Sequence, residues 1–191
     1  HVFNPQGHKA SDKRPAIVFF FGGGWIGGTP SQFYPHCQYL ASRGIVAMAA
    51  DYRVKSRDKT SPRECVMDGK SAVRWIRQHA AELGVDPAKV IAGGGSAGGH
   101  VAAATGTTVG FEQAGEDLSI SSRPDALVLF NPVFDNGPEG YGHGRVKAYW
   151  KDFSPMHNIG KDTPPTIVFL GTEDKLIPGK TAKTYKRLMK Q

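Results

Sequence analysis

The stretch Lys89-Val-Ile-Ala-Gly-Gly-Gly-Ser96-Ala-Gly-Gly-His100 decides the fold. It begins with a short apolar run, passes through three glycines and leads into the small residues 101–104. This order predicts a buried strand, a tight turn and a helix. Ser96 stands in the turn, with Gly94 and Gly98 two residues away on either side. The pattern G-x-S-x-G between strand and helix indicates a nucleophilic serine on a strained turn that leaves no room for neighbouring side chains.

Four more apolar runs of strand length surround this stretch and alternate with helical patterns. The predicted strands are Ala16–Phe21, Ile45–Ala50, Lys89–Ala92, Ala126–Phe130 and Thr166–Leu170. The runs are apolar throughout, which is typical of strands that helices cover on both faces. The alternation predicts an open α/β fold with a mostly parallel sheet, whose functional site lies at the carboxyl ends of the strands.

The clearest predicted helix begins at Ser61, where Pro62 and Glu64 complete a capping box. Apolar residues at spacings of three and four continue to Leu83, and Gly84 is expected to end the helix. Two shorter helices are expected over residues 33–44 and 182–188. Residues 107–123 and 135–165 are polar and rich in glycine and proline, which predicts long loops.

Charge and cysteine content limit the function classes. The 24 Lys+Arg exceed the 17 Asp+Glu, but the basic residues are scattered, so nucleic-acid binding is not expected. No apolar run is long enough for a membrane span. Cys37 and Cys65 lack metal-ligand spacing and fall on helices expected on opposite faces of the sheet, which favours buried free thiols. Localisation stays open, and a homo-oligomer is one possibility.

A second glycine turn, Gly22-Gly23-Gly24, directly follows the first predicted strand. Consecutive glycines let backbone N–H groups converge on one point, which suits a negatively charged oxygen. With the N–H of Ala97, those of Gly23 and Gly24 would form an oxyanion hole with three donors.

An acidic pair, Glu173-Asp174, follows the last predicted strand. A carboxylate at this place can orient an imidazole across the strand ends, and the order Ser96 then Asp174 is the one that a serine triad has on such a sheet. The alternative is a loop carboxylate that caps the helix after it.

These motifs resemble those of the α/β-hydrolases, in particular the hormone-sensitive-lipase-like and acetylxylan-esterase-like carboxylesterases. The resemblance implies the α/β-hydrolase fold and hydrolysis of short-chain carboxylic esters, with acetylated sugars as one candidate substrate and no cofactor or metal. It implies Ser96 as the nucleophile, Asp174 as the acid, and Gly23, Gly24 and Ala97 as oxyanion donors. It rests on motifs spread along nearly the whole chain: Gly22-Gly23-Gly24-Trp25, Asp51-Tyr52-Arg53, Arg74-Trp75-Ile76-Arg77, Gly84-Val-Asp86-Pro87, Gly94-Gly-Ser96-Ala-Gly-Gly99, Asn131-Pro132 and Gly171-Thr-Glu-Asp174.

The sequence departs from this family at two places. Phe21 stands where the family usually has a histidine that braces the glycine loop. The family places its catalytic histidine after the acid, and no histidine follows His157 in this sequence. The resemblance therefore implies a histidine beyond Gln191. Residues 1–191 are expected to form a single but incomplete α/β-hydrolase domain, nearly inactive on its own, with 107–123 and 135–165 as long loops near the site.

Other interpretations stay open at this stage. His100, His143 and His157 are weaker candidates for the base, and His36 and His79 are expected on exposed helix surfaces. Phe21, Trp25 and the aromatic residues of 135–165 indicate either an apolar or sugar-stacking mouth or ordinary packing.

Two rival functions also remain. A binding protein that kept the hydrolase pocket without its activity would explain a missing histidine. A dinucleotide site would use Gly22-x-Gly24-x-x-Gly27 with Asp51 at the end of the next strand. That site would leave Ser96 and Asp174 without a role.

Overall fold

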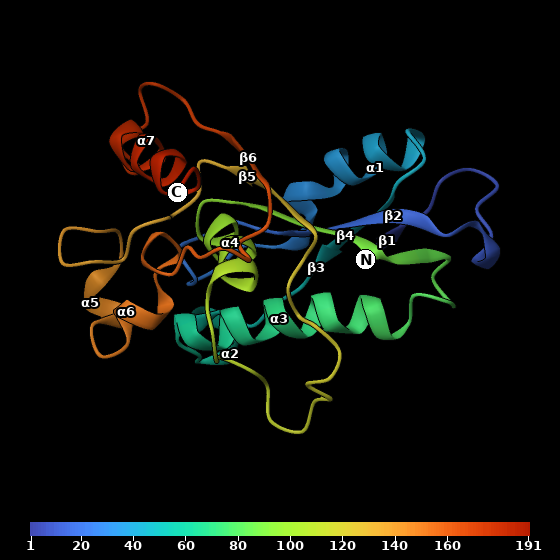
Figure 1. Ribbon diagram of the computed structural model, residues 1–191, viewed down its shortest axis with the longest axis horizontal. Coiled ribbons are helices and arrows are strands. Elements are labelled where there is room, and N and C mark those ends of the chain that lie inside the picture. Colours follow the sequence, from blue (N-terminus) through green and yellow to red (C-terminus); the bar gives the residue numbers. More distant parts are fainter.

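The computed structural model describes residues 1–191 and contains a six-stranded sheet (Figure 1). The strand order is β1-β3-β2-β4-β5-β6, with β1 antiparallel to β3 and every other pair parallel. The strands are β1 (Val2–Phe3), β2 (Arg14–Phe20), β3 (Val46–Ala50), β4 (Val85–Gly95), β5 (Ala126–Phe130) and β6 (Thr166–Phe169). The predicted mostly parallel sheet is confirmed.

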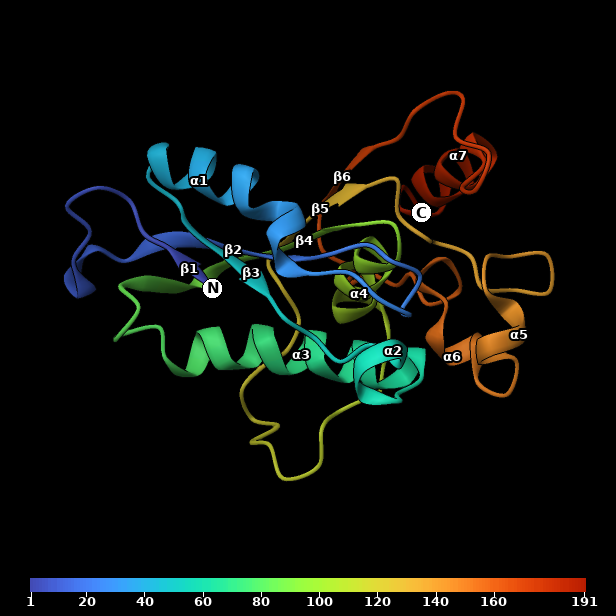
Figure 2. The same ribbon diagram turned by 180° about the vertical axis from the view of Figure 1, so that it is seen from behind.

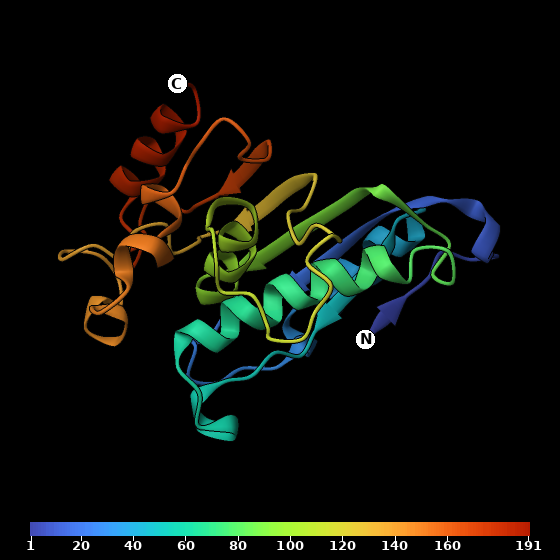
Figure 3. The ribbon, with the colours of Figure 1, turned by 60° about the horizontal axis from the view of Figure 1, so that its bottom comes forward.

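Helices cover both faces of this sheet (Figures 1 and 2). The first helix, α1, lies on one face, and α3 and α4 pack side by side on the other (Figure 3). The α-helices are α1 (Tyr34–Ser42), α2 (Lys55–Asp58), α3 (Pro62–Gln78), α4 (Ala97–Thr107), α5 (His143–Val146), α6 (Trp150–Phe153) and α7 (Gly179–Leu188). Short 3-10 helices are η1 (Ala10–Asp12), η2 (Pro30–Phe33) and η3 (Pro155–His157). No helix has the length and apolar character that crossing a membrane requires.

The helix α3 begins as predicted and ends earlier. Ser61 and Glu64 form the expected capping box. The helix ends at Gln78, six residues before the predicted stop at Gly84, so the expectation for its last turn and a half was wrong. The imidazole Nδ1 of His79 lies 2.9 Å from the carbonyl oxygen of Trp75, and this oxygen also accepts the His79 backbone N–H. The apolar spacing continues past this point because the following turns still face the core.

The strand β6 corrects the expectation that every strand is covered on both faces. Its residues alternate in burial, and Ile167 and Phe169 are about half exposed, at 51 % and 49 %. On the exposed side the Phe169 ring stacks on Phe130 of β5, with ring centroids 5.2 Å apart. The last strand is therefore apolar in sequence although one of its faces is exposed and the other only partly buried.

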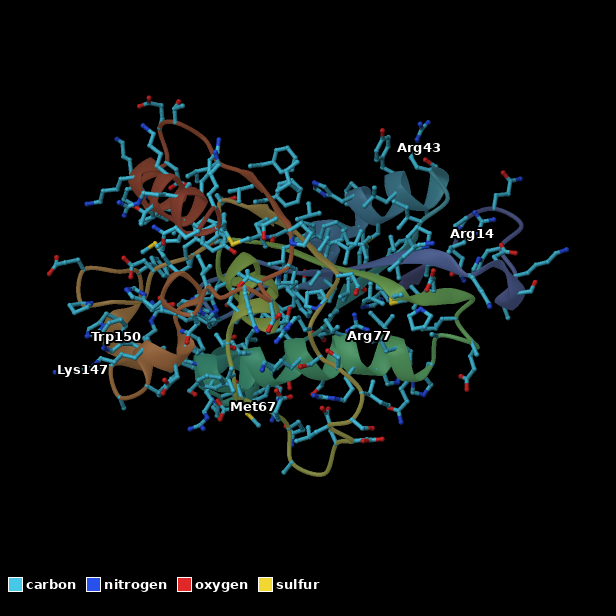
Figure 4. All side chains as sticks on the ribbon, in the orientation of Figure 1. Arg14, Arg43, Met67, Arg77, Lys147 and Trp150 are labelled. Carbon is cyan, nitrogen blue, oxygen red and sulfur yellow. The ribbon has the colours of Figure 1, made fainter.

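The segment between α4 and β5 runs back along α3 (Figure 3). Two buried cations of α3 hold it there: Lys70 bonds to Thr108 and Glu112, and Arg74 bonds to Glu112 and to the carbonyl oxygen of Ile120. Lys70 and Arg74 are 3 % and 4 % exposed. The labelled basic residues Arg14, Arg77 and Lys147 come from well-separated parts of the molecule (Figure 4).

Buried side chains on both faces of the sheet form one apolar core. Phe21 and Trp25 belong to it, at 0 % and 1 % exposed, so packing is the correct interpretation of these two aromatic residues and they form no mouth. Cys37 on α1 and Cys65 on α3 are buried free thiols on opposite faces, as predicted. Burial raises the pKa of Cys37 to about 11 and that of Cys65 to about 12.

Candidate active site

Ser96 occupies the turn between β4 and α4, as the sequence predicted. Its backbone has φ 53° and ψ −120°, a conformation that costs energy for a residue with a side chain. The neighbouring strand holds it there: the Ser96 N–H donates to the carbonyl oxygen of Phe130 at 3.0 Å, and the N–H of Val133 donates to the Ser96 carbonyl oxygen at 3.2 Å. The side chain is half-buried and directly precedes a helix N-terminus.

The glycines around Ser96 are required by close backbone contacts. A Cβ on Gly94 would lie less than 3.0 Å from the carbonyl group of Gly98. A Cβ on Gly98 would lie equally close to the carbonyl oxygens of Phe20 and Phe21. Side chains at these positions would push β2, β4 and α4 apart, so glycine at both is a condition for this turn.

The glycine loop after β2 lies against this turn. A Cβ on Gly22 would be 3.3 Å from the Cβ of Ser96. Gly23 and Gly24 have φ of 144° and 63°, and neither of their N–H groups donates a hydrogen bond within the protein. Ala97 is the first residue of α4, where a helix leaves its N–H groups without intrahelical partners.

Ser96 opens into a pocket of about 400 Å³ at the carboxyl ends of β2, β4 and β5. The side chains around it include two carboxamides, two phenyl rings and one imidazole. The lining residues are Gly22, Gly23, Gln32, Phe33, His36, Gly95, Ser96, Phe130 and Asn131. The structure thus brings Ser96 and Gly23 together, as expected, whereas the other two expected donors, Gly24 and Ala97, do not line this pocket.

Sequence reasoning missed Gln32 and placed His36 only on an exposed helix surface. His36 is exposed, but its ring also contacts Phe130, with centroids 5.5 Å apart, and lines the pocket. Both residues follow the glycine loop closely in sequence, on η2 and α1. The chain after the glycine loop folds back toward Ser96, and the residue pattern did not predict this change of direction.

Asp174 lies on the loop after β6 and does not line this pocket. Its Oδ1 accepts the N–H groups of Leu176 and Ile177, both at 2.9 Å. Its Oδ2 makes no hydrogen bond within the protein. One carboxylate oxygen therefore shapes the loop, and the other is free to accept a bond from another group.

The histidines considered as bases are bound elsewhere. His100 is fully buried, its Nε2 donates to the carbonyl oxygen of Phe153 at 3.2 Å, and burial lowers its pKa to about 3. His143 Nδ1 lies 2.9 Å from the carbonyl oxygen of Asn136, and His157 Nδ1 lies 2.9 Å from Ser154 Oγ. None of these rings is hydrogen-bonded to Ser96.

Two further features bear on the alternative interpretations. Asp51, the acid that a dinucleotide site would need, forms an ion pair of 3.0 Å with Arg57. A larger hollow of about 710 Å³ lies near Arg14, at the amino end of β2. Parallel α/β sheets bind ligands at the carboxyl ends of their strands, so the pocket at Ser96 is the better candidate in spite of its smaller volume.

Comparison of the sequence with known proteins finds one matching family and several curated relatives. Residues 2–135 match the model of the BD-FAE family. The chain is 28 % identical over 200 residues to "Esterase LipC" of Mycobacterium tuberculosis, an alignment that covers 90 % of this chain and 47 % of that protein. The chain thus spans about half the length of this curated relative.

Solved structures give a closer match. The chain is similar to esterase 2 of Thermogutta terrifontis phosphoramylated by tabun, with 51 % identity and a TM-score of 0.95 over 99 % of this chain and 72 % of that one. The same esterase with propionate bound matches with 49 % identity and a TM-score of 0.94, over 100 % of this chain and 72 % of that one.

Proposed function

The chain belongs to the BD-FAE family and has the α/β-hydrolase fold of esterases, and on this premise we propose that the protein hydrolyses short-chain carboxylic esters through an acyl-enzyme on Ser96. One observation carries the proposal. The strained Ser96 turn lies against a glycine loop whose Gly23 and Gly24 N–H groups have no partner in the protein, and Ser96 and Gly23 line one pocket. A nucleophile beside free backbone donors is the arrangement that acyl transfer needs.

In the first step Ser96 Oγ attacks the acyl carbonyl carbon. The proton of the hydroxyl passes to the imidazole that the family resemblance implies, which Asp174 would orient, and then to the departing alcohol. The free Oδ2 of Asp174 supports this role, since Oδ1 is already used by the loop. Water then attacks the acyl-enzyme, and the carboxylic acid leaves.

The negative charge that develops on the carbonyl oxygen is stabilised by the N–H groups of Gly23, Gly24 and Ala97. These donors belong to the backbone and are fixed before the reaction, so they need little reorganisation in the transition state. The N-terminus of α4 adds a favourable dipole at the same point. Phe33 and Phe130 give the pocket apolar walls that suit a short acyl chain.

Labelling by paraoxon tests the nucleophile directly. In the protein with its catalytic histidine in place, we expect one diethyl phosphoryl group per molecule, found by mass spectrometry on the peptide that contains Ser96, and rapid release of 4-nitrophenol. Ser96→Ala should lose the label and lower ester turnover by on the order of 10⁴-fold or more, with an unchanged fold. Absence of labelling together with binding of short esters would instead identify a binding protein that kept the pocket.

The narrower proposal that acetyl groups on carbohydrate are the substrate needs its own measurement. Acetate release from an acetylated xylo-oligosaccharide is compared with that from 4-nitrophenyl acetate under the same conditions. A higher kcat/KM for the oligosaccharide supports an acetylated sugar as substrate. Preference for the small ester supports an unspecialised carboxylesterase.

A further inference from the structure

The glycine loop is held by a side chain that no family motif includes. The N–H of Gly22 donates to Oε1 of Gln32 at 2.6 Å. Gln32 comes from η2, ten residues further along the chain, and its carboxamide also lines the pocket at Ser96. A backbone N–H can only donate, so the oxygen of this carboxamide must be the atom that faces Gly22.

The loop needs such an external support because of its composition. Gly23 and Gly24 both have positive φ, and glycine populates many backbone conformations with similar energy. Within the loop, the N–H groups of Ile26 and Gly27 donate to the carbonyl oxygen of Gly23, which fixes one side of the turn. No backbone hydrogen bond fixes the other side of the turn, at Gly22, which directly precedes the free N–H groups of Gly23 and Gly24.

The residue before the glycines cannot provide this support. Phe21 has a phenyl ring, which stacks on Tyr52 with centroids 4.2 Å apart and offers no hydrogen bond. Its backbone is held instead, since the Tyr52 hydroxyl donates to the Phe21 carbonyl oxygen at 2.6 Å. Arg145 Nη1 donates to the carbonyl oxygen of Gly24, also at 2.6 Å. Tyr52 and Gln32 thus bind the carbonyl oxygen and the N–H of the same peptide unit, Phe21–Gly22, and Arg145 binds the loop at Gly24.

We propose that Gln32 is a positioning residue for ester hydrolysis, which holds the Gly22 peptide so that the Gly23 and Gly24 N–H groups point at the developing oxyanion. This role rests on the proposed function. The Nε2 of Gln32 makes no hydrogen bond within the protein, so the carboxamide has one atom engaged and one atom free. Removal of the acceptor would leave the Phe21–Gly22 peptide held only through its carbonyl oxygen, by the Tyr52 hydroxyl, so the peptide could tilt about that one bond while the rest of the loop stays attached.

Three variants test this role in the full chain. Gln32→Met keeps the length of the side chain and loses the acceptor. Gln32→Glu keeps an acceptor for the Gly22 N–H and adds a negative charge beside the oxyanion. Gln38→Met is the matched control, because Gln38 is an exposed residue of α1 outside the Ser96 pocket.

The first readout is the rate of Ser96 phosphorylation by paraoxon, followed by intact mass. For Gln32→Met we expect a rate about 10- to 100-fold lower at saturating reagent, with little change in half-saturation, because misplaced donors weaken the transition state more than ground-state binding. Gln38→Met should react at the parent rate. A rate for Gln32→Met within about twofold of the parent would overturn the role.

The second readout is the pH dependence of the labelling rate, which would not change if Gln32 had a purely structural role. The carboxylate of Gln32→Glu opposes the oxyanion when charged and is neutral when protonated. Its rate relative to the parent should therefore rise as the pH falls from about 8 to about 5, toward the range where a carboxyl group protonates. A ratio that is constant over this range would count against the proposal.

The third readout does not depend on activity. Amide hydrogen exchange of the peptide that spans 21–31 should be faster in Gln32→Met than in the parent, while the other peptides keep their rates. Unchanged hydrogen exchange in this peptide would overturn the role even if Gln32→Met is labelled slowly by paraoxon. Absence of labelling in the parent would overturn the proposed function, which separates the two failures.

Discussion

The Nζ atom of Lys70 lies 2.8 Å from Oε1 of Glu112 and joins α3 to the segment that follows α4. The lysine also donates to the carbonyl oxygens of Thr108 and Gly110, at 2.9 and 2.6 Å. Burial lowers the pKa of Lys70, although Glu112 opposes this effect. A charge in such a place is tolerated because oxygen atoms accept from all three of its donor positions.

Lys70→Met should therefore destabilise the protein strongly. The side chain keeps its volume, but two carbonyl oxygens lose their donor and Glu112 keeps only Arg74 as a partner, at a cost of about 3 kcal/mol in the free energy of unfolding. Urea denaturation measures the change. Lys89→Met is the matched control, since Lys89 is 63 % exposed and its ion pair with Asp86 should be worth less than about 1 kcal/mol. Equal losses in the two variants would contradict the prediction.

Acid should weaken the fold through His100. Its pKa of about 3 lies below the value of about 6.5 in an unfolded chain, so the unfolded state binds more protons between these values. Stability contributed by the neutral ring is present above pH 6.5 and is lost as the pH falls, by about 2 kcal/mol at pH 5. The neutral ring packs edge-on against Trp25, with centroids 5.1 Å apart.

Replacement of the ring isolates this contribution. His100→Gln and His100→Asn cannot titrate, so the free energy of unfolding should fall less steeply between pH 6.5 and pH 5 than in the parent. The quantity to compare is this slope, because both variants also lose packing around Trp25 at every pH. Parallel slopes in parent and variants would show that His100 titrates alike in the folded and unfolded states, which would contradict the prediction.

The features that the sequence predicted depend on local chemistry. The G-x-S-x-G pattern is short, so Gly94 and Gly98 are enough to identify the turn at Ser96 from sequence, although the atoms that exclude a Cβ at Gly98 belong to Phe20 and Phe21. The apolar runs identified five strands to within a few residues at most of their ends. The strand β4 extends further at its amino end, to Val85, because Arg14 pairs with Val85 across a register shift.

The features that were missed depend on contacts between distant elements. Gln32 is an ordinary polar residue in sequence, and its bond to Gly22 exists only because the loop folds back toward Ser96. Trp25 is an apolar residue that could belong to the core or to a pocket wall. Only its packing against Phe153 and His100 identifies it as a core residue. Residue type alone carries no information about which of these environments a side chain enters.

Gly98→Ala should disrupt the Ser96 turn. Alanine is favoured over glycine within a helix by about 1 kcal/mol. That gain is outweighed because the new Cβ would overlap the carbonyl oxygens of Phe20 and Phe21, and backbone atoms of a central strand cannot move aside. We expect a loss of about 3 kcal/mol in the free energy of unfolding and much slower labelling by paraoxon. Gly144→Ala, with open space around its Cβ, should have neither effect.

Asp174→Asn separates the two roles of the Asp174 side chain. The amide oxygen of asparagine can still accept the N–H groups of Leu176 and Ile177, so the loop and the melting temperature should be unchanged. The negative charge that orients and stabilises an imidazolium is lost, and kcat for a short ester should fall by about 10³- to 10⁴-fold. Glu173→Gln removes a charge from the adjacent exposed residue and should keep the parent kcat. If Asp174→Asn turns over esters at the parent rate, Asp174 only shapes its loop, and the acid of the triad must be another residue.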